Sequence, residues 1–367
     1  MKFNIPGIAY LFPIIISNHF YFSGIFNYKV LFILGLIFLV NRIKIKILIF
    51  LIIFMIMQII SLMVYSKNLE SELILFFQVI LMSLGLYGWV ITGLHNEMLN
   101  ISPWFILIIG FLSMIMPYGS MFFSLDPLIL FLFLICCLRS KLKPIRVWNF
   151  LYFSAHTLIL SWRAAFVGLI AGMAFFLLRD TRLITRISFF VLLITSIWLI
   201  FNFYLQDLFN ILVQTGTAGD PTSGRIAMYV RAYEIFIASL ISLDWGAFFG
   251  YGLNSTASAF DDTLTVTVEI FGLEINSTKI VYGKDRLHMH NLFLQTLFEF
   301  GIVGFIIYCT TLIKLFRHSR NFSIFVIIGI VSGFLSATMY VYSSYFIVLY
   351  AIYCYDRKKR NEFIKHI

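Results

Sequence analysis

Charged residues are scarce in this chain. Only 12% of its 367 residues are Asp, Glu, Lys or Arg, whereas hydrophobic residues make up 61%, and the mean hydropathy is +0.95. A soluble domain carries roughly twice that share of charge. The composition therefore excludes a soluble protein and indicates a polytopic membrane protein. No separate cleavable signal peptide is expected, because the first apolar run leads directly into further apolar runs.

Cysteine is rare as well, and none lies in the one long polar segment, residues 206–290. The four cysteines are Cys136, Cys137, Cys309 and Cys354. No disulfide framework is therefore expected to hold that segment. The formal net charge of +10 comes mainly from short basic runs between apolar segments. This is the distribution of cytoplasmic loops, so we expect no nucleic-acid partner.

Apolar segments of spanning length recur along the chain. A transmembrane helix needs about 20 mostly apolar residues, which predicts about 12 spans here. The spans that matter below are Ile47–Tyr65, Leu73–Leu94, Ala164–Leu178, Asn291–Phe316, Phe322–Tyr340 and Ser343–Tyr355. Basic clusters mark the cytoplasmic side, on which both termini are placed, and the acidic turn Lys67–Glu72 faces out. No internal repeat of the kind common in secondary transporters is found.

The predicted fold is thus an all-α integral membrane protein with about 12 transmembrane helices and one large exported loop between spans nine and ten. Three regions follow from this topology. They are an N-terminal bundle of about nine spans (1–204), the loop (205–289), and about three C-terminal spans with a basic cytoplasmic tail (290–367).

The exported loop carries signals of ordered structure. Thr222 or Ser223 predicts a helix N-cap. Apolar residues then recur with helical spacing, at Ile226, Val230, Tyr233, Ile237 and Leu240. This stripe predicts an amphipathic helix that lies along the membrane surface or caps the bundle. The helix should stop near Asp244–Gly246, and the glycines at 246, 250 and 252 should loosen the backbone. Farther on, Thr263–Ile270 alternates as a strand does, and Glu274–Val281 is its expected partner.

Two arginines stand where a membrane protein can bind an anion. Arg163 separates two apolar runs near the outer end of a helical hairpin. It either snorkels to lipid headgroups or forms an anion site at the membrane boundary. Arg225 falls in the first turn of the predicted loop helix, where backbone N–H groups favour an anion and a guanidinium adds donors suited to phosphate. Arg231 and Glu234 are spaced i, i+3, and either they pair with each other or Arg231 belongs to the site.

Histidines precede the tenth predicted span. His288 and His290 form an H-x-H, but no third ligand with convincing spacing lies nearby, which disfavours a metal pair. A histidine next to several arginines is kept neutral, as a general base requires. Glu299 falls inside the span, where a carboxylate needs a partner, and we expect a structural or orienting role for it.

Three stretches resemble, in order, the Wzy/WaaL superfamily of bacterial O-antigen polymerases and O-antigen ligases. They are SWRAAFVGLIAGM (161–173), SGRIAMYVRAYEIF…WGAFFGYGLN (223–254) and HMHNLFLQTLFEFGIVGF (288–305). The third is the most specific. It matches the family pattern HNxxLxxxxExGxxG at His290, Asn291, Leu294, Glu299, Gly301 and Gly304. Two positions depart from the family: Trp162 interrupts its Ser-Arg pair, and Tyr229 stands where tryptophan is common. The resemblance covers about residues 147–320.

The resemblance implies a glycosyltransferase of the bacterial inner membrane whose active site faces the periplasm. Such enzymes move a glycan from undecaprenyl diphosphate to an acceptor sugar, with no cofactor. By match to the motifs, Arg163 and Arg225 hold the diphosphate, whose charge grows as it leaves, and His290 accepts the proton of the attacking hydroxyl. The expected substrate-binding residues are Arg231, Arg286, His288, Asn291, Tyr229 and Glu299. Lipid membranes, the lipid-linked oligosaccharide and a chain-length regulator protein are the expected partners.

Metal-independent chemistry is also expected. Asp261 and Asp262 suggest a metal site, but related enzymes that use a metal usually carry acidic residues in their first external loop. Here that loop, SNHFYFSGIFNYK, has none.

The resemblance leaves more than one function open. An O-antigen polymerase is favoured because the chain is compact and extremely rich in Phe, Ile and Tyr. An O-antigen ligase, which uses lipid A-core as acceptor, and a polymerase of capsule or exopolysaccharide are the alternatives. A lipid-linked oligosaccharide flippase should have short loops and charged residues that face a central cavity in both halves. Here the first six predicted spans contain almost no charge, and one loop is long. A scaffold protein would not need the arginines and histidines.

Overall fold

The computed structural model describes eight stretches and nine single positions of the chain. The stretches are residues 45–91, 163–179, 224–253, 255–270, 273–281, 291–335, 345–347 and 349–357, and the single positions are 151, 154, 181, 182, 184, 188, 191, 195 and 289. Within them, one helix, Leu292–His318, is long and apolar enough to cross a membrane, and three shorter stretches are apolar: Ile52–Tyr65, Ala164–Leu178 and Phe322–Phe334. Most of the fourth predicted span (73–91) and parts of the last one (345–347 and 349–355) are described as well. The other predicted spans lie wholly or mostly outside the described residues, so the number of about 12 stays a prediction.

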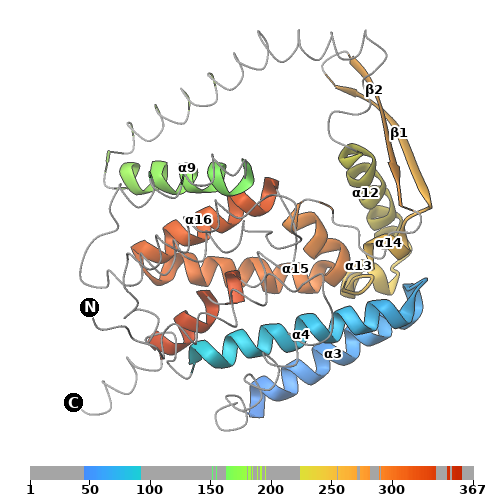
Figure 1. Ribbon diagram of the computed structural model, residues 1–367, viewed down its shortest axis with the longest axis horizontal. Helices are drawn as coiled ribbons and strands as arrows, with labels where there is room; N and C mark the ends of the chain where they lie inside the picture. Colours follow the sequence, from blue (N-terminus) through green and yellow to red (C-terminus); the bar gives the residue numbers. More distant parts are fainter. Residues whose placement is uncertain are drawn as a thin grey trace, which may run out of the picture.

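Helices dominate the described residues (Figure 1). They are α3 (Ile45–Tyr65), α4 (Leu69–Ile91), α9 (Arg163–Leu178), α12 (Arg225–Ile241), α13 (Trp245–Phe249), α14 (Thr256–Ala259), α15 (Leu292–His318) and α16 (Arg320–Leu335). The strands are β1 (Thr263–Ile270) and β2 (Leu273–Ile280). Residues 345–347 and 349–357 are also helical. Each predicted span that falls on described residues is therefore helical there.

Helices α9, α16 and α15 are stacked, with α3 and α4 beyond α15 (Figure 1). Gly168 of α9 lies so close to α16 that an added Cβ would be 1.9 Å from Ser332 Oγ. At the other end of α9, the Phe175 ring lies 6.0 Å from that of Phe316 in α15. Gly333, next to Ser332, lies against Leu292, where α15 begins. The starts of α9 and α15 therefore lie at the same end of the bundle, where α16 ends.

Helix α3 shows one apolar face to the outside. Its exposed side chains include Ile49, Ile52, Ile53, Ile56, Ile60, Met63 and Val64. The buried positions Gln58, Ser61 and Leu62 lie on the opposite face. A long exposed stripe of isoleucine is costly in water and suited to lipid, which agrees with the predicted span.

The polar loop folds into α12, α13, α14 and the hairpin β1–β2, which lie together at one end of the helices (Figure 1). The predicted hairpin is confirmed. Its strands are antiparallel, with Thr263 opposite Ile280 and Ile270 opposite Leu273. The second strand begins one residue earlier than the alternation predicted.

Helix α12 is where it was predicted, but two details of the prediction were wrong. Its N-cap is Gly224, in a left-handed conformation with φ 80°, and no side chain caps the helix there. Its buried face is Ala227, Met228 and Ala232. It is not the predicted stripe, whose Tyr233 is 63% exposed. The small side chains of Ala227 and Ala232 allow the β1–β2 hairpin to approach α12 closely, and larger side chains at these two positions would hold the hairpin and the helix apart.

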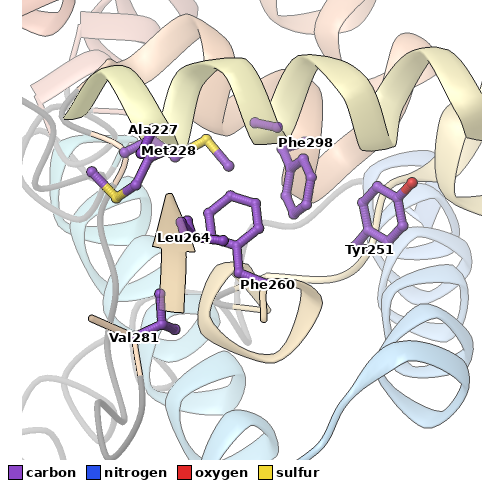
Figure 2. Packing of buried hydrophobic residues seen from close by; sticks show 9 residues of the cluster. Ala227, Met228, Tyr251, Phe260, Leu264, Val281 and Phe298 are labelled. Atoms are coloured by element: carbon purple, nitrogen blue, oxygen red, sulfur yellow. The ribbon is translucent and has the colours of Figure 1, made fainter. Parts of the chain in front are cut away.

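The buried face of α12 belongs to one apolar cluster that joins the loop to α15 (Figure 2). Its members are Ala227, Met228, Ala232, Tyr251, Phe260, Leu264, Val281, Met289 and Phe298. Within the cluster, the ring of Phe298 stacks on that of Tyr251 at 4.5 Å and lies 5.6 Å from that of Phe260. The loop thus has its own core, with α15 contributing one wall.

The loop glycines do not loosen the backbone as predicted. Gly250 has φ 86° and ψ 169°, and Gly301, inside α15, has φ 65° and ψ −172°. Only glycine adopts this region readily. The two residues face each other: a Cβ on Gly301 would be 2.6 Å from Gly250 N, and one on Gly250 would be 2.1 Å from Glu299 O. These glycines therefore permit contact between two backbones.

That contact is closed by hydrogen bonds where α15 is kinked. Tyr251 N–H donates to Phe298 O at 3.0 Å, and Gly252 N–H donates to Glu299 O at 3.2 Å. Backbone carbonyls near a helix break need other donors, and the loop supplies them. The loop and α15 are therefore one unit.

Candidate functional site

Arg225 is the first residue of α12, and the hairpin completes the turn on which it sits. Ser277 Oγ, from β2, accepts the Ala227 N–H at 3.0 Å, the work that an N-cap side chain usually does. Gly224 permits this approach, because a Cβ there would lie 2.8 Å from Thr278 O. Arg225 is half-buried at the positive end of the helix dipole. The position suits an anion.

Tyr229 lies one turn after Arg225, on the same face of α12. It is half-buried and packs against the apolar cluster. Burial raises the pKa of the Tyr229 phenol, and the positive charge of Arg225 lowers that pKa in part. The phenol therefore stays neutral near pH 7, where it can donate a hydrogen bond to a ligand held by Arg225.

The chain on both sides of His290 is fixed. Met289 is fully buried in the same cluster as Met228. Asn291 is the N-cap of α15, and its Oδ1 accepts the N–H groups of Phe293 at 3.1 Å and Leu294 at 3.0 Å. The Asn291 side chain thus has a structural task. His290 itself, like Arg286 and His288, lies outside the described residues.

Arg163 is the first residue of α9. Its helix start lies at the same end of the bundle as the start of α15, through the contacts of Gly168 with Ser332 and of Gly333 with Leu292. The rise of 1.5 Å per residue puts Arg163 about one and a half turns beyond Gly168. The Arg163 side chain is outside the described part of the structure.

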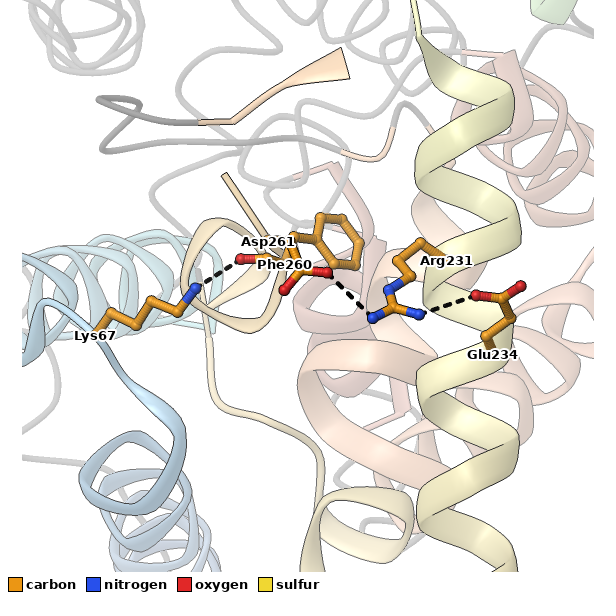
Figure 3. Close-up of polar contacts among 5 residues, drawn as sticks. All are labelled: Lys67, Arg231, Glu234, Phe260 and Asp261. Carbon is orange, nitrogen blue, oxygen red and sulfur yellow. Dashed lines mark hydrogen bonds and ion pairs between the residues drawn. The ribbon is translucent and has the colours of Figure 1, made fainter. Parts of the chain in front are cut away.

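Arg231 is held by two carboxylates (Figure 3). Its guanidinium lies 3.1 Å from Glu234 Oε2 and 3.1 Å from Asp261 Oδ2. Of the two alternatives for Arg231, the pairing with Glu234 is present, and a role in substrate binding stays a prediction. All three side chains are well exposed, so each pair is worth about 1 kcal/mol at most. Arg231 joins α12 to the segment after α14, and Asp261 is an ion-pair partner.

Glu299 is fully buried, and it has the partners that a buried carboxylate requires. Its Oε1 accepts hydrogen bonds from Gln295 Nε2 at 2.9 Å and from Thr256 Oγ1 at 3.3 Å. The second bond reaches from α15 to α14, so Glu299 orients the loop. This agrees with the structural or orienting role expected from its place in the sequence.

The α3–α4 hairpin makes contacts that the sequence did not predict. Gln58 donates to Phe249 O at 3.2 Å and accepts from Leu253 N–H at 3.1 Å. Tyr65 donates to Asp244 Oδ2 at 2.6 Å, and Ser61 accepts from Trp245 Nε1 at 2.9 Å. The only signal in the sequence was a few polar residues inside or just after an apolar span.

These features define a mostly helical structure whose polar loop folds over one end of the described helices, one of which is long and apolar enough to cross a membrane. Residues 148–309 match the model of the Wzy_C family, described as O-antigen ligase. This match supports the resemblance to the Wzy/WaaL superfamily that the three stretches predicted. The family comprises membrane-associated, glycosyltransferase-like enzymes of O-antigen and polysaccharide biosynthesis. Searches of the curated proteins and of the solved structures found no match.

Proposed function

We propose that this protein is an O-antigen polymerase of the inner membrane. It transfers a growing glycan from undecaprenyl diphosphate to a lipid-linked repeat unit on the periplasmic face. The reaction breaks the bond between the glycan and the diphosphate, and it forms a glycosidic bond to a hydroxyl of the acceptor. The proposal requires no metal and no cofactor.

The observation that carries the proposal is the setting of Arg225. A guanidinium at a helix start, one turn before a neutral tyrosine, offers two kinds of donor to a diphosphate. As the glycan leaves, negative charge builds on the diphosphate oxygens, and a fixed cation lowers the energy of that transition state. A lysine would keep the charge but lose the bidentate geometry.

Two further residues complete the proposed site. Arg163 is the second diphosphate ligand, supported by the placement of its helix start beside that of α15. His290 is the general base that takes the proton of the attacking hydroxyl. Support comes from its neighbours, since Met289 packs in the cluster of α12 and Asn291 is the N-cap of α15. Arg286 and His288 remain proposed substrate contacts by their nearness in sequence.

An O-antigen ligase is the second candidate, favoured by the description of the matching family. The two enzymes share a donor and differ in acceptor, which is lipid A-core for a ligase. The chemistry proposed for Arg225 and His290 is the same for both.

The lipopolysaccharide ladder of cells that lack this gene separates the candidates. Core carrying a single repeat unit identifies a polymerase. Core without any repeat, with long polymer left on the lipid carrier, identifies a ligase.

Complementation then tests the site. Wild type should restore the ladder, whereas Arg225→Ala and His290→Ala should not. Arg317→Ala is the matched control, because Arg317 is an exposed arginine in the last turn of α15, away from the loop. If both site variants restored a normal ladder at normal protein levels, the site would be wrong for either enzyme.

A further inference from the structure

The segment 258–261 is held from one side by the α3–α4 hairpin. Lys67 Nζ donates to Phe260 O at 2.8 Å (Figure 3). Ser258 Oγ donates to the carboxylate of Glu72 in the first turn of α4. Glu72 is 3% exposed, whereas Glu70 in the same turn is exposed. One of two neighbouring glutamates therefore faces the loop.

From the other side, the same segment is held by α12. Asp261 follows Phe260 directly, and its carboxylate pairs with Arg231 at 3.1 Å. Figure 3 shows Lys67 and Arg231 on opposite sides of Phe260 and Asp261. Phe260 and Asp261 thus connect the α3–α4 hairpin to α12, the helix that begins with Arg225.

Short helix α14 is held by two carboxylates at once. Thr256 bonds to Glu299 of α15, and Ser258 bonds to Glu72 of α4. Residues spaced i, i+2 do not share a face of a helix. The carboxylates therefore hold α14 from different sides, and both its rotation and its position are fixed.

Burial of Glu72 is unfavourable for a charge. Burial raises the pKa of the Glu72 carboxyl, and hydrogen bonds from Ser258 and Ser66 lower that pKa in part. An apolar side chain would fill the same space without this penalty. Unlike an apolar side chain, the Glu72 carboxylate accepts a directional hydrogen bond from Ser258.

We propose that Glu72 is a positioning residue for the reaction: by holding Ser258 it fixes segment 258–261, and through Asp261 and Arg231 it fixes α12 and Arg225. Glu72 precedes the family match at 148–309, so the site depends on the N-terminal hairpin as well as on the matched region. The inference rests on the function proposed for Arg225.

The physical part of this inference is tested without any activity. Amide hydrogen exchange is measured on the full-length protein in lipid nanodiscs, for peptides that cover 255–262 and the start of α12. Glu72→Ala removes a hydrogen bond to a charged group, so exchange in the peptide that covers 255–262 should be about tenfold faster. Exchange at the start of α12, which is coupled through the exposed Asp261–Arg231 pair, should be faster by up to about fivefold. Ser258→Ala removes the same bond from the loop side and should match it. Glu72→Gln keeps an acceptor and should restore slow exchange, and Glu70→Ala is the matched control. Unchanged exchange in both Glu72→Ala and Ser258→Ala would overturn the inference.

The functional part is tested by ladder formation with the same variants. Glu72→Ala and Ser258→Ala should each reduce the polymer about tenfold at equal protein level, and the double variant should be no worse than either. Glu72→Gln should rescue. Faster exchange with a normal ladder would overturn the role of Glu72 while leaving Arg225 in place. A normal ladder from Arg225→Ala would instead overturn the proposed function, whatever the exchange data. If Glu72→Ala is not produced, Ser258→Ala gives the same readings.

Discussion

Replacing Gly250 by alanine should separate the loop from α15. The residue has φ 86° and ψ 169°, a region that costs any other residue about 1–3 kcal/mol. The new Cβ would also lie 2.1 Å from Glu299 O and 2.4 Å from Phe300 N. Both are backbone atoms of α15, which cannot rotate out of the way as a side chain can.

The segment around Gly250 must therefore move away from α15, and two hydrogen bonds are then lost. They are Tyr251 N–H to Phe298 O and Gly252 N–H to Glu299 O, each worth about 0.5–1.5 kcal/mol net. With the conformational strain, the loss is about 2–6 kcal/mol. In a chain of 367 residues, a change of this size should lower the melting temperature by about 3–8 °C.

The assay is the thermal loss of the monodisperse elution peak of the full-length protein in detergent. Gly333→Ala is the control: Gly333 is also buried, but the nearest atom to its added Cβ is the Leu292 Cδ2 methyl at 3.0 Å, which can move. The control should melt within about 1 °C of wild type. If Gly250→Ala melted together with the control, the account of the kink as a glycine-dependent backbone contact would be refuted.

Three further outcomes follow from contacts in the loop. Ser277→Ala should weaken the start of α12 by about 1 kcal/mol, seen as faster exchange of the Ala227 amide, whereas Thr267→Ala on the exposed face should leave that amide unchanged. Burial raises the pKa of Tyr251, so its contribution to stability is present below pH 10 and is lost as pH rises through the higher folded pKa. The melting temperature should therefore fall as the pH rises above about 10, and Tyr251→Phe should flatten that fall; an unchanged slope would contradict the assignment. Arg225→Lys should fail to restore the ladder although it keeps the charge, and full restoration would show that bidentate contact is not needed.

Local patterns in the sequence were sufficient to predict the hairpin and α12 in the loop. The alternation of Thr263–Ile270 predicted the hairpin, because one face of each strand must be buried. The helical spacing after Arg225 predicted α12. Its buried face was not predicted, because the largest apolar side chains marked the stripe while the hairpin needed small ones, Ala227 and Ala232. Which face packs depends on the partner, and the partner lies some 50 residues farther along the chain.

Contacts between residues far apart in the chain could not be predicted either, because each depends on a partner that local patterns do not identify. Glu72 and Ser258 are 186 residues apart, and Gln58 and Phe249 are 191 apart. A lone buried glutamine or glutamate near the end of an apolar segment has no periodic partner that would reveal its target. The kink at Gly301 was likewise hidden, since the spacing of apolar residues continues through it. The motif residues Arg225 and Glu299 were found because their neighbours match a family pattern.

The hydrogen bond from Ala227 to Ser277 has a consequence for biogenesis. The first turn of α12 is finished by a residue that leaves the ribosome some 50 positions later, and the loop is joined to α15 by bonds to Phe298 and Glu299. Neither can form while the chain is still being inserted from its N-terminal end. The helix that begins with Arg225 should therefore stay immature until the segment carrying Glu299 has entered the membrane, so a truncated chain would present no working site to its substrate lipid.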